Sequence, residues 1–158
     1  MRVLAFDPGY ERLGVAVIEK QNGKEVLLYS DCVRTPAKLS FPERLKILGE
    51  AAETLVSDWE PKAVALEDVY FQNNAKTAMQ IAQVRGMLAY IAARADLPVH
   101  HYTPPQVKAA VTGSGRGDKR AVATMVGKLV SLPAKKRLDD ELDAIAVGIT
   151  CLASVRVY

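Results

Sequence analysis

The dipeptide Asn22-Gly23, which separates two segments of alternating apolar and polar residues, constrains the fold more than any other feature. Asn-Gly is typical of the two-residue turn of a β-hairpin, because both central residues of that turn need a positive φ. The flanking segments, Leu13–Glu19 and Glu25–Val33, are therefore expected to pair as antiparallel strands. A further apolar segment, Arg2–Asp7, opens the chain, so the sequence predicts three consecutive antiparallel strands.

Helical and strand-like segments alternate after these three strands. Ser40, with Glu43 three residues later, forms a capping box that predicts the start of a helix ending near Trp59. The later predicted elements are a strand at Ala63–Glu67, a helix at Ala75–Ala95, a strand at Leu97–Tyr102, a short helix capped by Thr103, a basic helix at Asp118–Val130 and a last helix at Asp139–Ser154. This order predicts an α/β fold, with a five-stranded mixed sheet and helices on both faces.

The predicted helix at residues 75–95 is apolar on more than one face. One face of a sheet cannot cover all of these side chains, so a second helix or a partner subunit is needed to cover the remainder. Met79 and Met87 are candidates for a contact between two copies of the chain, and ordinary packing in the core is the alternative interpretation.

Size and composition indicate one globular domain spanning residues 1–158, of which 49% are hydrophobic. The two cysteines, Cys32 and Cys151, have neither the Cys-x-x-Cys spacing nor the histidines of a structural zinc site. Asp7 and Pro8 interrupt the first apolar segment too early for a signal peptide, and no segment reaches the roughly 18 apolar residues of a membrane span. We therefore expect a cytoplasmic protein that does not interact with a membrane.

Positive charge is concentrated in the second half of the chain. Residues 1–79 carry 10 Lys/Arg against 12 Asp/Glu, whereas residues 80–158 carry 11 against 6. Between residues 101 and 138, eight cationic side chains accompany a single acid, Asp118. Such a segment is typical of a surface that contacts a phosphate backbone, and a solvated basic face is the alternative.

A glycine-rich stretch, Gly113–Gly117, lies inside this basic segment. It is not preceded by a strand, and no Ser or Thr follows Lys119, so it does not match a nucleotide-binding phosphate loop. We expect it to be a flexible loop that presents Arg116, Lys119 and Arg120 to DNA.

Four carboxylates lie at the ends of predicted elements. Asp7 and Glu67 end the first and fourth strands, and Asp140 and Asp143 are three residues apart in the first turn of the last helix. Carboxylates gathered in a buried site repel one another, and Mg²⁺ is a hard cation that takes oxygen ligands. Alternatives remain: Asp7 can form an Asx turn, the helix acids can serve the helix dipole, and Asp139 faces Asp143 as well as Asp140 does.

Several motifs, taken together, resemble the RuvC family of Holliday-junction resolvases. They are DPG at residues 7–9, ERLKIL at 43–48, LEDVY at 66–70, QVRG at 83–86, QVK at 106–108, LPA at 132–134 and D-x-x-D-A at 140–144. The motifs span nearly the whole chain in the order expected of that family. DPG alone is uninformative, whereas the complete series is specific.

This resemblance implies a ribonuclease H-like fold in which Asp7, Glu67, Asp140 and Asp143 are catalytic and bind metal, the D-x-x-D-A spacing selecting Asp140 over Asp139. It also implies that Lys108 and Lys119 contact DNA near the scissile phosphate, with Lys119 taking part in catalysis. Tyr70 lies where the family has an aromatic ring at the junction centre, and Phe71 beside it leaves open which ring stacks. The expected activity is symmetric, paired nicking of four-way DNA junctions during recombination and repair.

Such an activity implies two Mg²⁺ ions about 4 Å apart in each active site, with Mn²⁺ as a possible substitute. Symmetric nicking calls for a homodimer, expected to form through the helix at 75–95, and the family's usual partner is a branch-migration helicase complex. Two rival hypotheses remain: a ribonuclease H-like enzyme that cuts RNA or RNA–DNA hybrids with the same carboxylates, and an inert DNA-binding protein.

Overall fold

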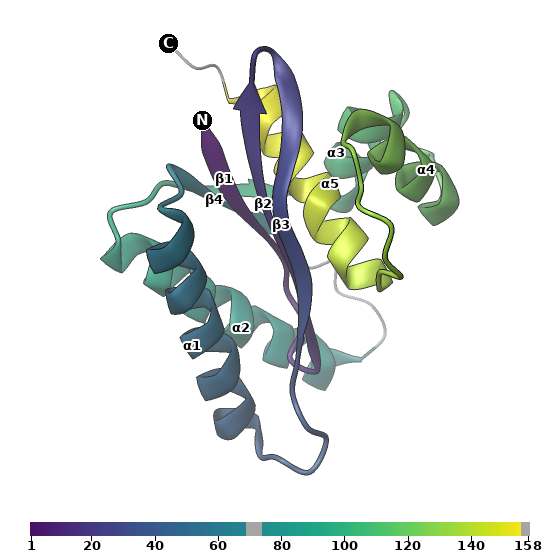
Figure 1. The fold of residues 1–158 in the computed structure, drawn as a ribbon. Helices are drawn as coiled ribbons and strands as arrows, with labels where there is room; N and C mark the ends of the chain where they lie inside the picture. Colours follow the sequence, from purple (N-terminus) through teal and green to yellow (C-terminus); the bar gives the residue numbers. More distant parts are fainter. Residues whose placement is uncertain (69–73, 156–158) are drawn as a thin grey trace.

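The computed structural model describes residues 1–68 and 74–155, which form a five-stranded mixed sheet with helices on both faces (Figure 1). The strands are β1 (Arg2–Asp7), β2 (Arg12–Gln21), β3 (Lys24–Arg34), β4 (Ala63–Glu67) and β5 (Val99–Tyr102), in the spatial order β3-β2-β1-β4-β5. The first three strands are antiparallel, and β4 and β5 run parallel to β1. Asn22 and Gly23, with φ of 50° and 80°, form the predicted turn between β2 and β3.

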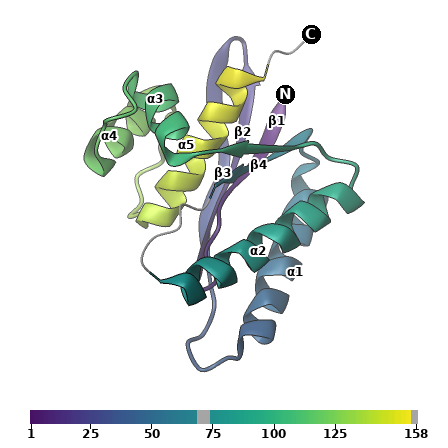
Figure 2. The same ribbon diagram turned by 180° about the vertical axis from the view of Figure 1, so that it is seen from behind.

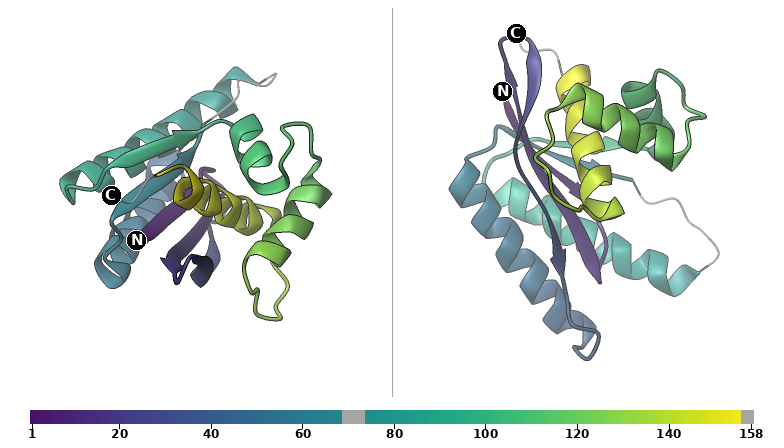
Figure 3. Two further views of the ribbon diagram at one scale, coloured as in Figure 1. Left: turned by 90° about the horizontal axis from the view of Figure 1, so that it is seen from above. Right: turned by 45° about the vertical axis from the view of Figure 1, so that its right-hand side comes forward.

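Helices cover the sheet on both sides, as predicted. On one face, α1 (Phe41–Trp59) and α2 (Ala75–Arg94) lie side by side, and on the other α5 (Asp139–Ser154) crosses the strands (Figures 1 and 2). Two shorter helices, α3 (Pro104–Thr112) and α4 (Lys119–Leu129), pack outside α5 (Figure 3). Successive side chains of β1 point to opposite faces of the sheet and so contribute to two cores. Leu4 and Phe6 pack with α1 and α2, whereas Val3 and Ala5 pack with α5.

Local capping fixes where several helices begin. Ser40 and Glu43 form the expected capping box at the start of α1. Thr103 caps α3, and the Asp118 side chain accepts a hydrogen bond from the backbone N–H of Ala121 at the start of α4. Each cap satisfies backbone donors that have no partner inside the helix.

α5 is buried on nearly all sides. Every residue from Ala144 to Leu152 is buried, because the sheet covers one side of the helix and α3 and α4 cover the other. Gly148 permits this close packing: a Cβ there would lie 2.7 Å from Cδ1 of Ile18. The helix is thus held in one position, which also fixes the acidic residues at its start.

Two sequence interpretations need correction. β5 begins at Val99 rather than Leu97, because the backbone N–H of Leu97 bonds to the carbonyl of Ala92 and closes the end of α2. Met87 is partly buried and packs against the core beside Gly49, so ordinary packing explains it. Met79, by contrast, is 61% exposed. Among the described residues, no helix is both long and apolar enough to span a membrane.

Candidate active site

Asp7 and Glu67 lie next to each other at the carboxyl ends of two parallel strands. Phe6 of β1 is in register with Leu66 of β4, so the following residues end their strands at the same edge of the sheet. Each of the two side chains influences the pKa of the other, so they lie close together.

The start of α5 brings Asp140 and Asp143 to this pair. Both carboxylates raise the pKa of Asp7, which places them within electrostatic reach of it. Asp139 is exposed and its charge raises the pKa of Asp143, whereas the charge of Asp140 raises the pKa of Asp7 as well as that of Asp143. The structure therefore favours Asp140 over Asp139 as the member of the cluster.

Gly14 of β2 makes this approach possible. A Cβ at this position would lie 1.9 Å from the carbonyl oxygen of Asp140 and 3.2 Å from Cβ of Asp7. Any side chain larger than hydrogen would force α5 away from the sheet at the site itself. An isolated glycine inside a strand is typical of such close approach, so Gly14 carried a usable sequence signal.

Asp7, Glu67 and Asp143 all have raised pKa values. Burial, followed by the charges of Glu67, Asp143 and Asp140, raises the pKa of Asp7 well above its ordinary value. Burial and the charge of Asp143 raise the pKa of Glu67 to about 7, and burial raises the pKa of Asp143. Such a cluster of perturbed acids is typical of a functional site.

Three cations partly compensate this negative charge. The ammonium of Lys119 lies 3.6 Å from Oδ2 of Asp143, and Nε of Arg12 lies 3.4 Å from Oδ2 of Asp140. The charge of Asp143 raises the pKa of Lys119, so this lysine stays protonated. Lys108 lies near enough to lower the pKa of Glu67. The structure thus brings both family-matched lysines to the carboxylates, together with Arg12, which the sequence analysis had missed.

A buried glutamate anchors the start of α5. Glu141 is 4% exposed, and its Oε1 accepts a hydrogen bond from Oγ of Ser30 at 2.6 Å. The same oxygen lies 2.7 Å from Nζ of Lys135 and 3.2 Å from Nε of Arg137. These contacts join β3, the segment before α5 and the helix itself, and so fix the position of Asp140 and Asp143.

A second polar network fixes the chain directly after Glu67. Arg85 on α2 forms an ion pair with Asp68, and its Nη2 lies 2.9 Å from Nδ1 of His101 on β5. The backbone N–H of Asp68 also donates to the carbonyl of Tyr102 at 2.7 Å. Arg85 belongs to the QVRG motif, so this motif has a structural role next to the carboxylates.

The donor set fits a divalent cation that prefers oxygen. The four side chains offer only carboxylate oxygens, and a cation between them would relieve the repulsion that contributes to the raised pKa values of Asp7, Glu67 and Asp143. Across residues 1–68 and 74–155, no three Asp, Glu, His or Cys side chains already stand in a ligand arrangement around one point.

The remaining predicted DNA-binding residues lie elsewhere. Arg116 follows α3 and Arg120 lies in the first turn of α4, and both are exposed. No contact ties either of them to the carboxylates among the residues that the structure describes. Tyr70 and Phe71 fall outside the described residues.

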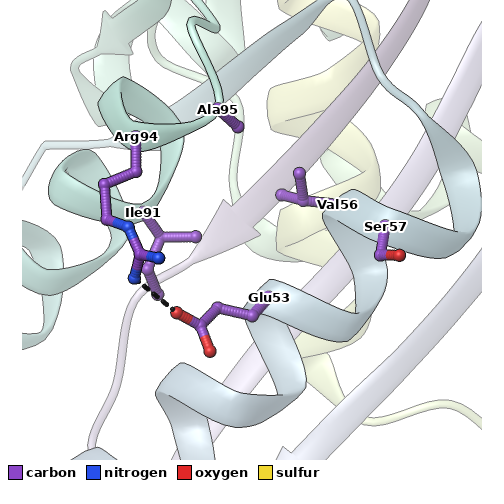
Figure 4. Close-up of a pocket in the computed structure, with 6 residues that line it drawn as sticks. All are labelled: Glu53, Val56, Ser57, Ile91, Arg94 and Ala95. Atoms are coloured by element: carbon purple, nitrogen blue, oxygen red, sulfur yellow. Dashed lines mark hydrogen bonds and ion pairs between the residues drawn. The ribbon is translucent and has the colours of Figure 1, made fainter.

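A shallow pocket between α1 and α2 lies away from the carboxylates. Val56 and Ser57 line it from α1, and Ile91 lines it from α2 (Figure 4). The ion pair between Glu53 and Arg94 spans the gap between the two helices. The pocket lies where α1 ends. The chain then enters β4 at Ala63, and Glu67 is at the other end of that strand.

Comparison with known proteins identifies the family. The sequence model described as "Crossover junction endodeoxyribonuclease RuvC" matches residues 3–151. The chain belongs to the RuvC family. The crossover junction endodeoxyribonuclease RuvC of Mycolicibacterium smegmatis is 45% identical over 150 residues, covering 94% of this chain and 81% of that protein. The RuvC of Rhodococcus opacus is 46% identical over 150 residues, covering 94% of this chain and 79% of that protein.

A solved RuvC structure has the same fold. The structure of Thermus thermophilus RuvC in complex with a Holliday junction substrate aligns with a TM-score of 0.88 and 31% sequence identity. The alignment covers 95% of this chain and 92% of that chain. The predicted ribonuclease H-like fold and the resemblance to RuvC are both confirmed.

Proposed function

We propose that this RuvC protein resolves four-way DNA junctions by hydrolysing phosphodiester bonds at the cluster of Asp7, Glu67, Asp140 and Asp143. The observation that carries the proposal is the convergence of these four carboxylates, from β1, β4 and α5, beside the ammonium of Lys119. Separate parts of the sequence supply them, and only the fold brings them together.

RuvC nucleases are metal-dependent, and we propose that this chain uses Mg²⁺, two ions in each active site, with Mn²⁺ able to replace them. The four carboxylates would hold the ions, Asp7 being the member influenced by all three others. When bound, such ions supply positive charge at the scissile phosphate and lower the pKa of a bound water.

The chain's own cations then act on the substrate. Lys119 is 75% exposed although it contacts Asp143, so its ammonium is available to a phosphate oxygen in front of the carboxylates. Its raised pKa keeps it charged across the physiological range. Positive groups placed where negative charge develops are effective because they need no rearrangement during the reaction. Lys108, whose charge lowers the pKa of Glu67, would neutralise the same phosphate group.

Other predicted residues would extend the DNA contact. Arg116 and Arg120 would bind phosphates from the exposed side of α3 and α4, where cations predominate. Either Tyr70 or Phe71 would stack at the junction centre.

Resolution of a two-fold symmetric junction calls for two active sites, so we propose a homodimer. Met79 and Tyr90 of α2 are 61% and 62% exposed, and we assign the subunit contact to this helix. Two further expectations stay predictions: a branch-migration helicase complex as partner, and a cytoplasmic site of action.

A cleavage assay tests the proposal. A synthetic four-way junction with a mobile crossover and a linear duplex of the same sequence are incubated with Mg²⁺, with Mn²⁺ and with EDTA, and nicks are mapped on all four strands. We expect paired nicks on opposing strands, in the junction alone and with metal alone. Cutting of linear DNA or of an RNA–DNA hybrid would refute junction resolution, and tight junction binding without any cutting would refute the nuclease assignment.

A further inference from the structure

A pocket of about 470 Å³ lies between α1 and β3, on the face of the sheet that α1 and α2 cover. Tyr29 and Val33 line it from β3, and Leu55, Asp58 and Trp59 line it from α1. None of the four catalytic carboxylates is part of its lining. Its volume is within the range of about 300–1,000 Å³ that is typical of binding pockets. The pocket is therefore a site separate from the nuclease centre.

Two aromatic rings form part of the pocket wall. The ring centroids of Tyr29 and Trp59 are 5.7 Å apart, with an angle of 34° between the ring planes. Both residues are only partly buried. Aromatic rings attract cations, and the alkyl stem of lysine or arginine packs well on apolar surface. This wall therefore suits a side chain that is apolar along its length and positively charged at its end.

The charge around the pocket is negative. Asp58 lines the pocket, and Asp31 accepts a hydrogen bond from the hydroxyl of Tyr29 at 3.3 Å. Both acids are exposed, and neither forms an ion pair with another side chain in the described part of the chain. Two carboxylates without a cation attract positive charge and repel a phosphate backbone. The pocket is thus complementary to a basic segment of a protein and not to DNA.

The strand beside this pocket can pair with a further strand. β3 has 11 residues and is an outer strand of the sheet (Figure 1). It pairs with β2 on one side, and the described residues place no strand on its other side. The segment before α5 meets β3 on the opposite face, where Ser30 contacts Glu141 and Lys135. An unpaired strand edge can bind an extended peptide through main-chain hydrogen bonds, and pockets on one face then receive alternate side chains.

We propose that β3 and this pocket dock an extended basic segment of a partner protein. The segment adds to the edge of β3 and packs the alkyl stem of an arginine or lysine against Tyr29 and Trp59. The cationic end of that side chain lies at Asp58 and Asp31. The proposal does not depend on the nuclease assignment, since the catalytic carboxylates take no part in it. A partner held here would leave the carboxylates and the basic helices α3 and α4 free for DNA.

A peptide selection tests this proposal. Random peptides of about nine residues, within the usual length of a β-strand, are displayed on phage and selected on the wild-type protein. Peptides that also bind Thr54→Arg are discarded. Thr54 is exposed and lines the pocket, so an arginine there would introduce a competing cation. We expect the selected peptides to contain arginine or lysine among β-branched or aromatic residues.

Synthetic copies of the selected peptides are then titrated, and binding is followed through the fluorescence of Trp59, the single tryptophan. Asp58→Asn should weaken binding about 2- to 5-fold, and the double variant Asp31→Asn/Asp58→Asn about 5- to 20-fold. Glu50→Gln is the matched control, since Glu50 is an exposed acid of α1 that pairs with Lys46 and does not line the pocket. It should bind like the wild type.

The peptide offers the complementary change. Replacing its basic residue by methionine should weaken binding to the wild type, and Asp58→Asn should then have no further effect, because both changes remove the same contact. If the selection enriches no peptide, the proposal is wrong. It is also wrong if the enriched peptides bind Asp58→Asn and the Glu50→Gln control equally well.

Two other occupants are separated by the same variants. If junction DNA in EDTA changes the fluorescence of Trp59 and Asp58→Asn strengthens that DNA binding, the pocket lies in the DNA path and the proposal is overturned. If Thr54→Arg lowers the sedimentation coefficient of the protein while its Tm is unchanged, the pocket is a contact between two copies of the chain, which also overturns the proposal.

Discussion

Replacing Glu67 with glutamine should make the metal-free protein more stable at alkaline pH. Burial and neighbouring acids raise the pKa of Glu67 from an ordinary 4.5 to about 7. The folded state therefore holds a proton that the unfolded chain releases between these two pH values. Stability is full below pH 4.5 and falls as the pH rises toward 7, because the folded state binds more protons in this window.

The size of the effect follows from the shift. A difference of about 2.5 pKa units corresponds to roughly 3 kcal/mol, an upper limit because Glu67 and Asp7 influence each other's pKa. Glutamine has the shape of the protonated acid but cannot ionise. We expect Glu67→Gln to exceed the free energy of unfolding of the wild type by less than about 1 kcal/mol at pH 5 and by up to about 3 kcal/mol at pH 8. For a chain of this length, that is about 6–12 °C in Tm.

Urea unfolding in EDTA at pH 5, 6, 7 and 8, followed through the single tryptophan, Trp59, measures this difference. The control is Glu53→Gln, which neutralises an exposed carboxylate paired with Arg94 on the far side of the molecule. A constant offset between Glu67→Gln and the wild type across the whole range would refute the reasoning. Adding Mg²⁺ at pH 8 should stabilise the wild type more than the variant, since binding to the native state adds stability.

Four further outcomes are expected. Asp7→Asn should reduce junction cleavage by about 10³-fold or more while junction binding in gel-shift assays persists. Gly14→Ala should destabilise the fold by about 2–3 kcal/mol in urea titrations and abolish cleavage, because the methyl group would overlap the carbonyl of Asp140. The control Gly127→Ala, in α4, should instead be neutral or stabilising. Met79→Glu should lower the sedimentation coefficient by weakening the dimer without lowering Tm. Glu141→Gln should cost about 2–3 kcal/mol in thermal unfolding, because it leaves the buried guanidinium of Arg137 without its acid and removes the partner of Lys135.

Most of the fold could be predicted because nearby turn and capping residues set the ends of many helices and strands. Asn22-Gly23 adopts the positive φ values that the hairpin needs, and Ser40 caps α1 with Glu43 as expected. The start of β5 could not be predicted in this way. Leu97 continues the apolar pattern of the strand, but its N–H is taken by the carbonyl of Ala92 at the end of α2, a contact that hydrophobicity does not reveal.

The proximity of two site residues could be predicted only where their positions at the ends of strands determine it. Asp7 and Glu67 end parallel strands, so their proximity follows from topology. The choice between Asp139 and Asp140 came from the D-x-x-D-A spacing of the RuvC family, because α5 is apolar all round and a helical wheel cannot orient it. Glu141 shows the same limit: its partner Ser30 lies 111 residues away, and nothing in a run of acids marks one as buried.

The same helix therefore serves stability and catalysis. The buried length of α5 anchors it between the sheet and α3, and this packing forces the acids of its first turn toward Asp7. Repulsion among the carboxylates opposes this placement, whereas the α5 dipole, Arg12 and Lys119 favour it. Because Asp7 is buried and these cations compensate only part of the neighbouring negative charge, the pKa of Asp7 stays raised. Core packing holds the carboxylates together despite their repulsion. A divalent cation bound to the cluster would therefore be more stabilising than one bound to any single carboxylate.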